Sequence, residues 1–509
     1  MNTADYLLAT GQDNSVAVVT DSSSFTYSEL RSRCARMAGE LLARGVKPGD
    51  RIGLCGGNSL NWIAAYMAVM KLAAVAVPLA TTATPDDIRS MIAFSGCTMT
   101  CADRRSARIL AGLGLEDHTL ILDEAADKPG PNAWPATTPD VPDADAALMF
   151  TSGTTARPRA VRVTHRNIQA NTDSICQYLQ LDDRERIGVV LPFYYCFGLS
   201  LLHSHLRAGA AVVLINSFVY PEAALDLLER AQCTGFAAVP SIYQLLLRDS
   251  SFCRRKFAHL RKVQQAGGKL QDILIRELAA ALPQAQVYIM YGQTEATARL
   301  SYLPPALLSE KLGSVGCGIP GVTLRVLDDS GLPVHPGDIG EICAQGDNVC
   351  PGYWNDPEAS AEKFIGGLLH TGDLATVDDD GFIYIVDRKS DFIKPFGNRV
   401  SSQQIESCVL ELPDVVAAAA IGEPDLVSGE AIKVFVTLRT ASQLHPADII
   451  AHCARRLSRH MIPHEVAVLE HLPLNTHGKV VKSELRKLAA GKLSVADANR
   501  EASPAIITQ

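Results

Sequence analysis

The sequence predicts an α/β protein with two domains. The larger N-terminal domain is built from parallel sheets with helices and includes a small β subdomain, and the smaller C-terminal domain is α+β. Three observations predict this fold. The chain has 509 residues, which is too long for one simple hydrophobic core. Its first half alternates helix-like and strand-like segments, as parallel sheets do. After about residue 314, residues alternate at the strand period between Asp-Ser-Gly and Pro-Gly turns.

The first long helix is predicted from Thr26 to about Gly45. Thr26 is a typical N-cap, Glu29 completes a capping box, and Gly45 is a stop signal. The apolar stretch of residues 62–79 contains Lys71 and Pro78, which divide it. We therefore expect a helix to about Lys71 and a buried strand over residues 73–78, and no membrane span.

Further along, short apolar runs between helical stretches predict the remaining strands of the parallel sheets. One of these runs delivers its strand directly into the hydroxyl-rich loop that follows Phe150. We predict an N-terminal domain over residues 1–388, in which residues 314–388 include the small β subdomain. The C-terminal domain covers residues 389–494, and residues 495–509 form a loose tail.

Charge and cysteine content limit the classes of function. The formal net charge of −8 argues against nucleic acid as the main partner, because phosphate backbones need a basic surface. The 13 cysteines are scattered without any CxxC spacing, which favours ordinary cytosolic thiols over zinc ligands or disulfides. His203 and His205 have a spacing at which two histidines can bind a metal. We favour the alternative, that they are interior residues of a helix. No secretory signal is visible at the N-terminus, so we expect a cytoplasmic protein.

The strongest local signal is the segment from Phe150 to Arg159. A strand delivers a loop of hydroxyls, a glycine and two arginines, which together suit phosphate oxygens. No GKS or GKT follows, so this is not a Walker A loop. A polar surface loop is the alternative.

Three later motifs add groups that suit a nucleotide. Tyr291-Gly292-Gln293-Thr294-Glu295 follows a strand and offers a hydroxyl for phosphate and a carboxylate for Mg²⁺. Thr371-Gly372-Asp373 and Asp387-Arg388 offer a carboxylate for a ribose diol. Residues 473–479 end in Gly478-Lys479. Taken singly, these motifs also fit a helix N-cap, a turn and a solvated charge.

In this order the four motifs resemble the adenylate-forming ANL superfamily of acyl- and aryl-CoA synthetases, adenylation domains and luciferases. The resemblance covers nearly the whole chain. It extends to residues 191–198, residues 266–270, residues 315–321, Gly340-Glu341 and Gly352-Tyr353-Trp354. It implies ATP and AMP, Mg²⁺ and coenzyme A as cofactors and co-substrates, and a C-terminal domain that is mobile.

The resemblance also implies a role for each matching residue. The β- and γ-phosphates of ATP would lie on Thr151, Ser152, Gly153, Thr154, Thr155 and Arg159. Thr294 would contact the α-phosphate, and Glu295 would hold Mg²⁺. The adenine would be framed by Gly267, Gly268, Tyr291 and Gly292, and the ribose would be held by Asp373 and Arg388. Lys479 would bridge the carboxylate and the α-phosphate, so the catalytic set is Lys479, Thr294 and Glu295.

The remaining implied residues belong to the acid and to coenzyme A. The acyl pocket would be lined by Tyr194, Tyr195, Phe197, Gln264, Ala266 and Thr297. Ser390 falls at the hinge, and Lys394 and Gly397 would line the pantetheine path, where a side chain at Gly397 would obstruct. No aspartate stands near Pro192 to select an α-amino group, which favours a fatty, aryl or polycyclic acid over an amino acid.

The chain departs from the family pattern in its phosphate loop. Ala156 and Ala160 stand where relatives usually carry glycine, and alanine would be strained if its φ were positive. One hypothesis is that adenylation is weakened and that the enzyme acts chiefly on a ready-made acyl-adenylate. The alternative is that small residues are tolerated and both half-reactions run. Ser390 replaces a usual Asp or Lys, and Tyr195 replaces a usual histidine.

The sequence therefore predicts an acid–thiol ligase that forms an acyl-CoA thioester through an acyl-adenylate by domain alternation. Its partners would be a small carboxylic acid or its adenylate and coenzyme A, and a homodimer is compatible with the sequence. A stand-alone enzyme that loads a carrier protein is the nearest alternative, and the lack of a visible carrier segment favours free coenzyme A. A non-catalytic relative that binds an acyl or nucleotide ligand is the third reading.

Overall fold

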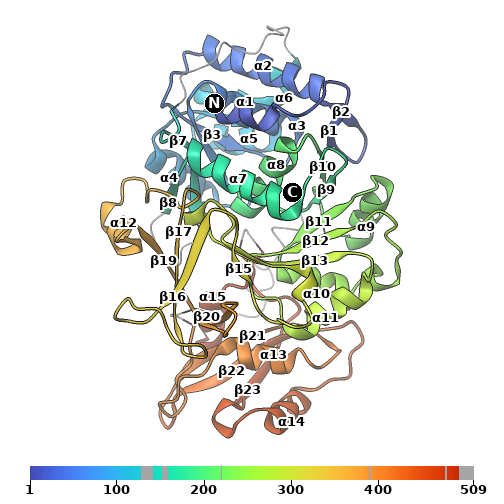
Figure 1. The fold of residues 1–509 in the computed structure, drawn as a ribbon, viewed down its shortest axis with the longest axis vertical. Helices are drawn as coiled ribbons and strands as arrows, with labels where there is room; N and C mark the ends of the chain where they lie inside the picture. Colours follow the sequence, from blue (N-terminus) through green and yellow to red (C-terminus); the bar gives the residue numbers. More distant parts are fainter. Residues whose placement is uncertain (128–140, 152–158, 219, 389–390, 476–477, 492–509) are drawn as a thin grey trace.

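The structure is a computed structural model that describes residues 1–127, 141–151, 159–218, 220–388, 391–475 and 478–491. Two large sheets form the N-terminal part, and both are mainly parallel, as the sequence predicts. Their edges are antiparallel, a detail that the sequence did not reveal: β7 pairs with β8, β1 with β2, and β14 with β13 and β15. Figure 1 shows these sheets above the C-terminal elements.

The six-stranded sheet has the order β6-β5-β3-β4-β7-β8. Its strands are β3 (Arg51–Cys55), β4 (Val75–Leu79), β5 (Cys97–Ala102), β6 (Thr119–Ile121), β7 (Asp145–Thr151) and β8 (Arg159–Thr164). Its connecting helices include α2 (Tyr27–Ala43), α3 (Leu60–Lys71), α4 (Pro85–Ser95), α5 (Arg104–Gly112) and α6 (Leu122–Asp127).

The nine-stranded sheet has the order β15-β14-β13-β12-β11-β9-β10-β1-β2. Its strands are β1 (Val16–Val19), β2 (Ser24–Thr26), β9 (Arg186–Val189), β10 (Ala211–Leu214), β11 (Gly235–Ala238), β12 (Lys262–Gln265), β13 (Gln286–Tyr291), β14 (Ser301–Leu303) and β15 (Cys317–Gly318). The helices of this part are α1 (Thr3–Leu8), α7 (His165–Leu179), α8 (Cys196–Arg207), α9 (Pro221–Arg230), α10 (Pro240–Arg248) and α11 (Asp272–Ala281).

Helix α2 illustrates how local sequence fixes an element. Thr26 Oγ1 accepts a hydrogen bond from the Glu29 amide at 3.2 Å, and Glu29 Oε2 accepts from the Thr26 amide at 2.7 Å. This is the predicted capping box. Gly45, just beyond the helix, has a φ of +81°, which a glycine adopts without strain.

The apolar stretch of residues 62–79 divides into α3 and β4, as predicted. Lys71 ends the helix with a side chain that is only 2% exposed, and its Nζ pairs with Asp5 at 2.8 Å. In the described residues, no helix is both long enough and apolar enough to cross a membrane.

The predicted β subdomain is an antiparallel sheet of β16 (Val322–Leu327), β17 (Gly340–Gly346), β18 (Phe364–Ile365), β19 (Leu368–Val377) and β20 (Ile383–Arg388). The short helix α12 (Pro357–Lys363) precedes β18. Strand β20 ends at Arg388, where the sequence analysis placed the domain boundary.

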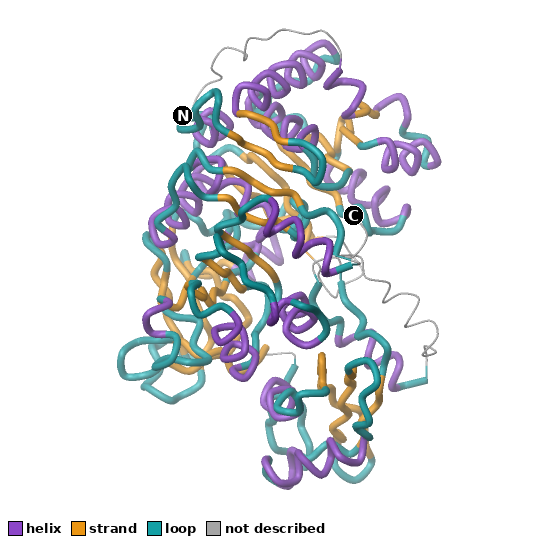
Figure 2. Tube along the Cα trace, turned by 90° about the vertical axis from the view of Figure 1, so that its right-hand side faces the viewer, coloured by secondary structure: helices purple, strands orange, loops and turns teal. Residues whose placement is uncertain are grey.

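The C-terminal elements form a separate group, at the bottom of Figures 1 and 2. Their sheet contains β21 (Val415–Asp425), β22 (Gly429–Leu438) and β23 (Glu465–Val468), and their helices are α13 (Ser402–Val409), α14 (Pro446–Arg456) and α15 (Lys482–Ala489). The predicted tail, residues 495–509, lies outside the described residues.

This group contacts the N-terminal part through a few polar links. Arg248 on α10 pairs with Glu277 at 2.6 Å and donates to the carbonyls of Leu410 and Leu412 at 3.3 Å and 3.2 Å. Ser241 Oγ donates to the carbonyl of Gly478 at 2.9 Å. These contacts hold the segment that carries Lys479 against the body.

Candidate active site

Two strands from different sheets end at the predicted phosphate residues. Thr151 ends β7 and Arg159 opens β8. The loop between them carries the predicted residues Ser152, Gly153, Thr154 and Thr155, together with Ala156, and lies outside the described residues. In the other sheet, β13 ends at Tyr291, and the 3₁₀ turn η3 (Thr294–Ala296) follows directly.

Tyr353 links these two regions. Its hydroxyl donates to Glu295 Oε1 at 2.7 Å, and the Arg159 guanidinium carbon lies 5.8 Å from the centre of its ring. Residues 353–354 pair alongside β8. Val161 forms an antiparallel β-bridge with Tyr353. In addition, the Trp354 amide donates to the carbonyl of Ala160 at 2.8 Å. Burial, reinforced by the Glu295 charge, raises the pKa of Tyr353 and keeps it a donor. The sequence analysis quoted Tyr353 within a motif but gave it no role.

Glu295 is suited to the Mg²⁺ that the sequence predicts. One of its oxygens is held by Tyr353, and the other accepts no hydrogen bond from any residue that the structure describes. Hard oxygen ligands are the ones that Mg²⁺ prefers. The carboxylate is thus fixed in place with an oxygen available for a cation.

Asp373 is held by Tyr291, the last residue of β13, and by Arg388. The Tyr291 hydroxyl donates to Asp373 Oδ2 at 2.7 Å, and Arg388 Nε lies 3.3 Å from Oδ1. Asp373 and Arg388 are register partners on β19 and β20. Burial first, and then the Asp373 charge, raise the pKa of Tyr291 well above its ordinary value. An oriented carboxylate beside a guanidinium is the geometry that a ribose diol requires.

Two of the predicted adenine glycines are required by close packing. A Cβ at Gly292 would stand 1.9 Å from the carbonyl oxygen of Ala298. At Gly267, where φ is +91°, it would stand 2.7 Å from Tyr195 Oη and 2.9 Å from Val239 Cγ1. Gly268 is less restricted, since its Cβ would lie 3.3 Å from Pro240 Cγ.

Lys479, from the C-terminal group, lies within electrostatic range of Glu295 and Asp373, and the region that these residues surround is called the cleft below. The Lys479 amide donates to Asn475 Oδ1 at 2.9 Å, and its Nζ lies 6.0 Å from the centre of the Tyr195 ring. Burial, followed by repulsion from Arg388, lowers the pKa of Lys479, while Cys196, Asp373 and Glu295 oppose that shift. The structure therefore brings the lysine together with Asp373, Arg388 and Glu295, although about a hundred residues or more separate them in sequence.

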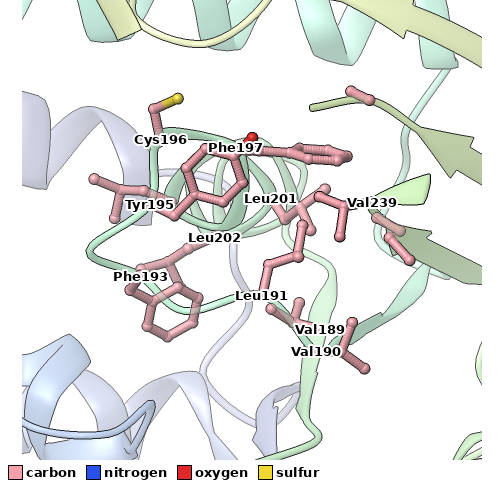
Figure 3. Packing of buried hydrophobic residues seen from close by; sticks show 14 of the residues in the cluster. Val189, Val190, Leu191, Phe193, Tyr195, Cys196, Phe197, Leu201, Leu202 and Val239 are labelled. Carbon is pink, nitrogen blue, oxygen red and sulfur yellow. The ribbon is translucent and has the colours of Figure 1, made fainter. Parts of the chain in front are cut away.

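The start of α8 supplies the aromatic residues of the predicted acyl pocket. Tyr195 and Phe197 are buried, with ring centres 6.3 Å apart in an edge-on arrangement. Figure 3 shows them with Cys196 among the apolar core side chains. Tyr194, Gln264 and Ala266 are also buried. Thr294 Oγ1 lies 3.4 Å from Cys196 Sγ, which places the predicted phosphate threonine next to this helix.

Thr297 adopts a conformation that its residue type disfavours. Its φ of 67° and ψ of −58° centre a γ-turn in which the Ala298 amide donates to the Ala296 carbonyl at 2.7 Å. This turn is rare and strained, above all for a β-branched residue. Thr297 Oγ1 donates to the carbonyl of Asn348 at 2.7 Å, which helps to hold it. Such strain is concentrated at functional sites.

A small cavity, about the size of one water molecule, lies behind this region. It is lined by Cys196, Ser200 and His203 of α8, by Thr297, and by residues of α3, α7, β7 and β8. The two helix histidines are interior residues, as preferred above. His203 Nε2 lies 2.9 Å from the Tyr66 hydroxyl, and His205 Nδ1 lies 2.9 Å from the Leu201 carbonyl. Burial lowers the pKa of His203 to about 3 and that of His205 to about 4.

The predicted pantetheine residues Lys394 and Gly397 belong to the segment that follows the domain boundary. Ser390 is outside the described residues. Lys394 donates its amide to Glu430 Oε2 at 2.6 Å. Gly397 has a φ of +77°, and a Cβ there would meet no atom within 4 Å. In this orientation the positive φ, and not crowding, accounts for the glycine.

Ala160 does not have the backbone strain that its place in the phosphate motif suggested. Ala160 lies inside β8, is fully buried, and is not among the described residues with positive φ. Its methyl group packs in an apolar cluster with Leu148 and Val77. The backbone strain considered for this alanine is therefore absent, and the hypothesis of weakened adenylation depends on Ala156 alone.

Among the described residues, one group contains three side chains of the types that bind metals, in the C-terminal part. One ligand atom each of Cys408, Glu411 and His452 lies within 4.8 Å of the others. Glu411 is already paired with His452 at 3.0 Å and with Arg456 at 2.9 Å. An ion-pair network between α14 and Glu411, which follows α13, explains this cluster.

Comparison with known proteins identifies the family of this chain. Residues 8–354 match the model of the AMP-binding enzyme family, and residues 404–479 match the AMP-binding enzyme C-terminal domain. A feruloyl-CoA synthase from Amycolatopsis sp is 32% identical over 482 residues, which cover 93% of this chain and 96% of that protein.

Two solved structures are similar over nearly the whole chain. One is the o-succinylbenzoate CoA synthetase of Bacillus subtilis in complex with its acyl-adenylate intermediate, with a TM-score of 0.85, 27% identity, and coverage of 95% and 98% of the two chains. The other is ATP-bound MatB from Rhodopseudomonas palustris, with a TM-score of 0.85, 29% identity, and coverage of 96% and 98%. The chain therefore belongs to the AMP-binding enzyme family, within the adenylate-forming ANL superfamily of acyl- and aryl-CoA synthetases.

Proposed function

We propose that this protein is an AMP-forming ligase that joins a carboxylic acid to coenzyme A through an acyl-adenylate. The observation that carries the proposal is the position of Lys479, which lies in the cleft near Glu295, Asp373 and Arg388. A protein that only binds a nucleotide has no need to bring a lysine from a separate domain to this point.

In the first half-reaction, a carboxylate oxygen of the acid attacks the α-phosphorus of ATP and pyrophosphate leaves. Negative charge builds on the phosphate oxygens, and preorganised cations stabilise it most effectively. Lys479 is assigned to the α-phosphate and the acid, Thr294 to the α-phosphate, and Arg159 to the outer phosphates. Mg²⁺ held by Glu295 would supply further positive charge at the phosphates.

In the second half-reaction, the thiol of coenzyme A attacks the acyl carbon and AMP leaves. The thiol needs a path to the place that Lys479 occupies here, so the C-terminal domain has to rotate away. We assign the boundary between residues 388 and 389 as the pivot, with Ser390 at the hinge. Lys394 and Gly397 would then form the face that binds the pantetheine.

The acceptor of the acyl group and the cellular compartment are proposed from the similarity to known CoA ligases and from the cysteine chemistry. Free coenzyme A is the proposed acceptor, in keeping with the feruloyl-CoA synthase that resembles this chain. All 13 cysteines are free thiols, which supports a reducing compartment, and we place the enzyme in the cytoplasm. The acid is proposed to be fatty, aryl or polycyclic, because buried aromatic side chains fill the start of α8.

The test is a panel of acids offered in two ways: as free acid with ATP and coenzyme A, and as synthetic acyl-AMP with coenzyme A alone. We expect thioester and AMP from both for the cognate acid, with the free-acid reaction lost in Lys479→Ala. Lys47→Ala, which changes an exposed lysine, is the matched control. Acyl transfer to a carrier protein but not to coenzyme A would favour the carrier-loading alternative. Nucleotide binding without turnover for any acid would favour the binding protein.

A further inference from the structure

Arg299 is a buried cation without a buried anion to pair with. Its side chain is 1% exposed, yet no carboxylate of the described residues lies within 4.0 Å of it. Two other buried cations do have a carboxylate partner: Arg248 pairs with Glu277 at 2.6 Å, and Lys71 pairs with Asp5 at 2.8 Å. Buried charges in proteins are normally paired.

The neighbours of the guanidinium are neutral. Arg299 Nη1 donates to the Tyr178 hydroxyl at 2.6 Å and contacts Met290 Sδ at 2.8 Å, and Nη2 lies 3.5 Å from Ser200 Oγ. Arg299 Nε has no hydrogen-bond partner among the described residues. Burial raises the pKa of Tyr178, so its hydroxyl does not supply the missing negative charge.

A second buried polar side chain on the same side of the sheet also lacks partners. Gln264 is 0% exposed, and neither Oε1 nor Nε2 forms a hydrogen bond with any described residue. It is the register partner of Tyr288, and register partners of parallel strands present their side chains to the same face. The Tyr288 ring lies 6.4 Å from the ring of Tyr178, which is the residue that Arg299 contacts.

A chain of aromatic contacts joins these groups to the reacting end of the cleft. Lys479 Nζ lies 6.0 Å from the Tyr195 ring, the Tyr195 and Phe197 rings are 6.3 Å apart, and the Arg299 guanidinium carbon lies 4.9 Å from the Phe197 ring. Ser200, beside Arg299, also lines the small cavity that reaches Cys196 and Thr297. These contacts place the buried guanidinium next to Phe197, on the side of the predicted acyl pocket that is reached from Lys479 through Tyr195.

From this geometry we infer that the acid carries a second carboxylate at the end remote from the activated one, and that Arg299 binds it with help from Gln264. The inference rests on the proposed function. A guanidinium pairs with a carboxylate through two parallel N–H donors, and its Nε is one of the donors without a partner. The Gln264 amide adds a further N–H donor. The spacer between the two carboxylates is apolar, because Tyr195 and Phe197 flank it.

The experiment uses pairs of acids in which only the distal carboxylate is replaced by methyl: octanedioate with octanoate, and terephthalate with 4-methylbenzoate, followed by longer members of both series. Acid-dependent pyrophosphate release by the full-length enzyme gives kcat/KM for each acid. We expect the wild type to favour the dicarboxylate of a pair that fits by about 100-fold or more, because sites built to hydrogen-bond a group strongly reject analogues that lack it.

The variants assign that preference to residues. Arg299→Met should abolish or invert the preference, Arg299→Lys should retain part of it, and Gln264→Leu should reduce it by about tenfold. Arg255→Met is the control, since it changes a largely buried arginine that pairs with Glu222 and Asp226 and is assigned no role in the site, and it should leave the ratio unchanged. If Arg299→Met does not fold, the lysine and Gln264 variants still test the inference. Melting curves of the wild type with each acid provide a measure that is independent of turnover.

The outcomes separate the two levels of proposal. Pyrophosphate release with monocarboxylates only, and an unchanged ratio in Arg299→Lys and Gln264→Leu, would overturn the inference while the ligase function stands. Failure of every acid to release pyrophosphate would instead contradict the proposed function. A higher melting temperature with a dicarboxylate, absent in Arg299→Lys, would support binding at this site.

Discussion

Tyr353 and Glu295 are joined by a 2.7 Å hydrogen bond, with the phenol as donor and the carboxylate as acceptor. They lie 58 residues apart in sequence, and the same phenol ring lies under Arg159. The bond fixes the residue assigned to Mg²⁺ and connects it to the strand that follows the phosphate loop. From this bond we propose that Tyr353 positions Glu295 for the first half-reaction.

We predict that Tyr353→Phe weakens adenylation by about tenfold or more, because a hydrogen bond to a charged group contributes about 1.5–3 kcal/mol. ATP–pyrophosphate exchange, measured as a function of Mg²⁺ concentration, gives the effect. Thioester formation from acyl-AMP should be unchanged. Tyr384→Phe is the control, because the Tyr384 hydroxyl also donates to a carboxylate, that of Asp378, at 3.2 Å but outside the cleft. Equal losses in both half-reactions would mean that the variant disturbs the fold.

Lys479 should impose an alkaline limit on adenylation alone. The lysine has to be protonated to stabilise phosphate charge, and burial together with Arg388 lowers its pKa. Adenylation should therefore decline as pH rises through a value below that of an ordinary lysine, which is about 10.4. The pH dependence of kcat/KM reports this group in the free enzyme. Lys479→Arg should remove the alkaline decline, since arginine stays protonated. A decline of the same shape in thioester formation from acyl-AMP would refute the assignment.

Gly267→Ala should damage both stability and acid binding. Its φ of +91° costs alanine about 1 kcal/mol, and the added Cβ would press on Tyr195 Oη at 2.7 Å. We expect a lower melting temperature and a higher KM for the acid. Gly337→Ala is matched in backbone, with a φ of +88°, but would meet nothing within 4 Å. The comparison separates strain from crowding, and identical behaviour of the two variants would argue against a tight fit at Gly267.

The buried pair of Lys71 and Asp5 should be a strong determinant of stability. Lys71 is 2% exposed, so Asp5→Asn removes the carboxylate charge that lies 2.8 Å from a buried ammonium group. Breaking such pairs costs about 3–5 kcal/mol. Urea denaturation should show a clearly lower midpoint. Asp143→Asn, which breaks the exposed pair with Arg166, should leave the midpoint unchanged. A small effect of Asp5→Asn would contradict the assignment of this pair as a strong determinant of stability.

Ala160→Gly alone should not raise ATP–pyrophosphate exchange. The residue lies inside β8 without a positive φ and is fully buried. A glycine there loses packing and increases the freedom of the unfolded chain, so stability should fall by about 1 kcal/mol. Ala156→Gly is the variant that tests whether adenylation is weakened. A gain in exchange from Ala160→Gly would contradict the structural interpretation.

The sequence predicted much of the fold because the signals involved are local. The capping box of Thr26 and Glu29 and the division of residues 62–79 at Lys71 depend on a few adjacent residues, and both are confirmed. Antiparallel pairing at the sheet edges was not predicted, because short apolar strands such as β14 carry no signal for the direction of their partners. The strained Thr297 was also missed, since its φ opposes the preference of its residue type.

The sequence by itself determined the family and the order of the motifs, and it predicted which groups face the nucleotide. Each of these depends on contiguous residues, whose chemistry can be read without coordinates. Only the tertiary structure decided which groups meet: Tyr353 with Glu295, Lys479 with the Tyr195 ring, and Arg299 with neutral neighbours alone. The physical reason is that pairing and desolvation depend on distance and burial in space. A buried arginine and an exposed one look the same in a sequence.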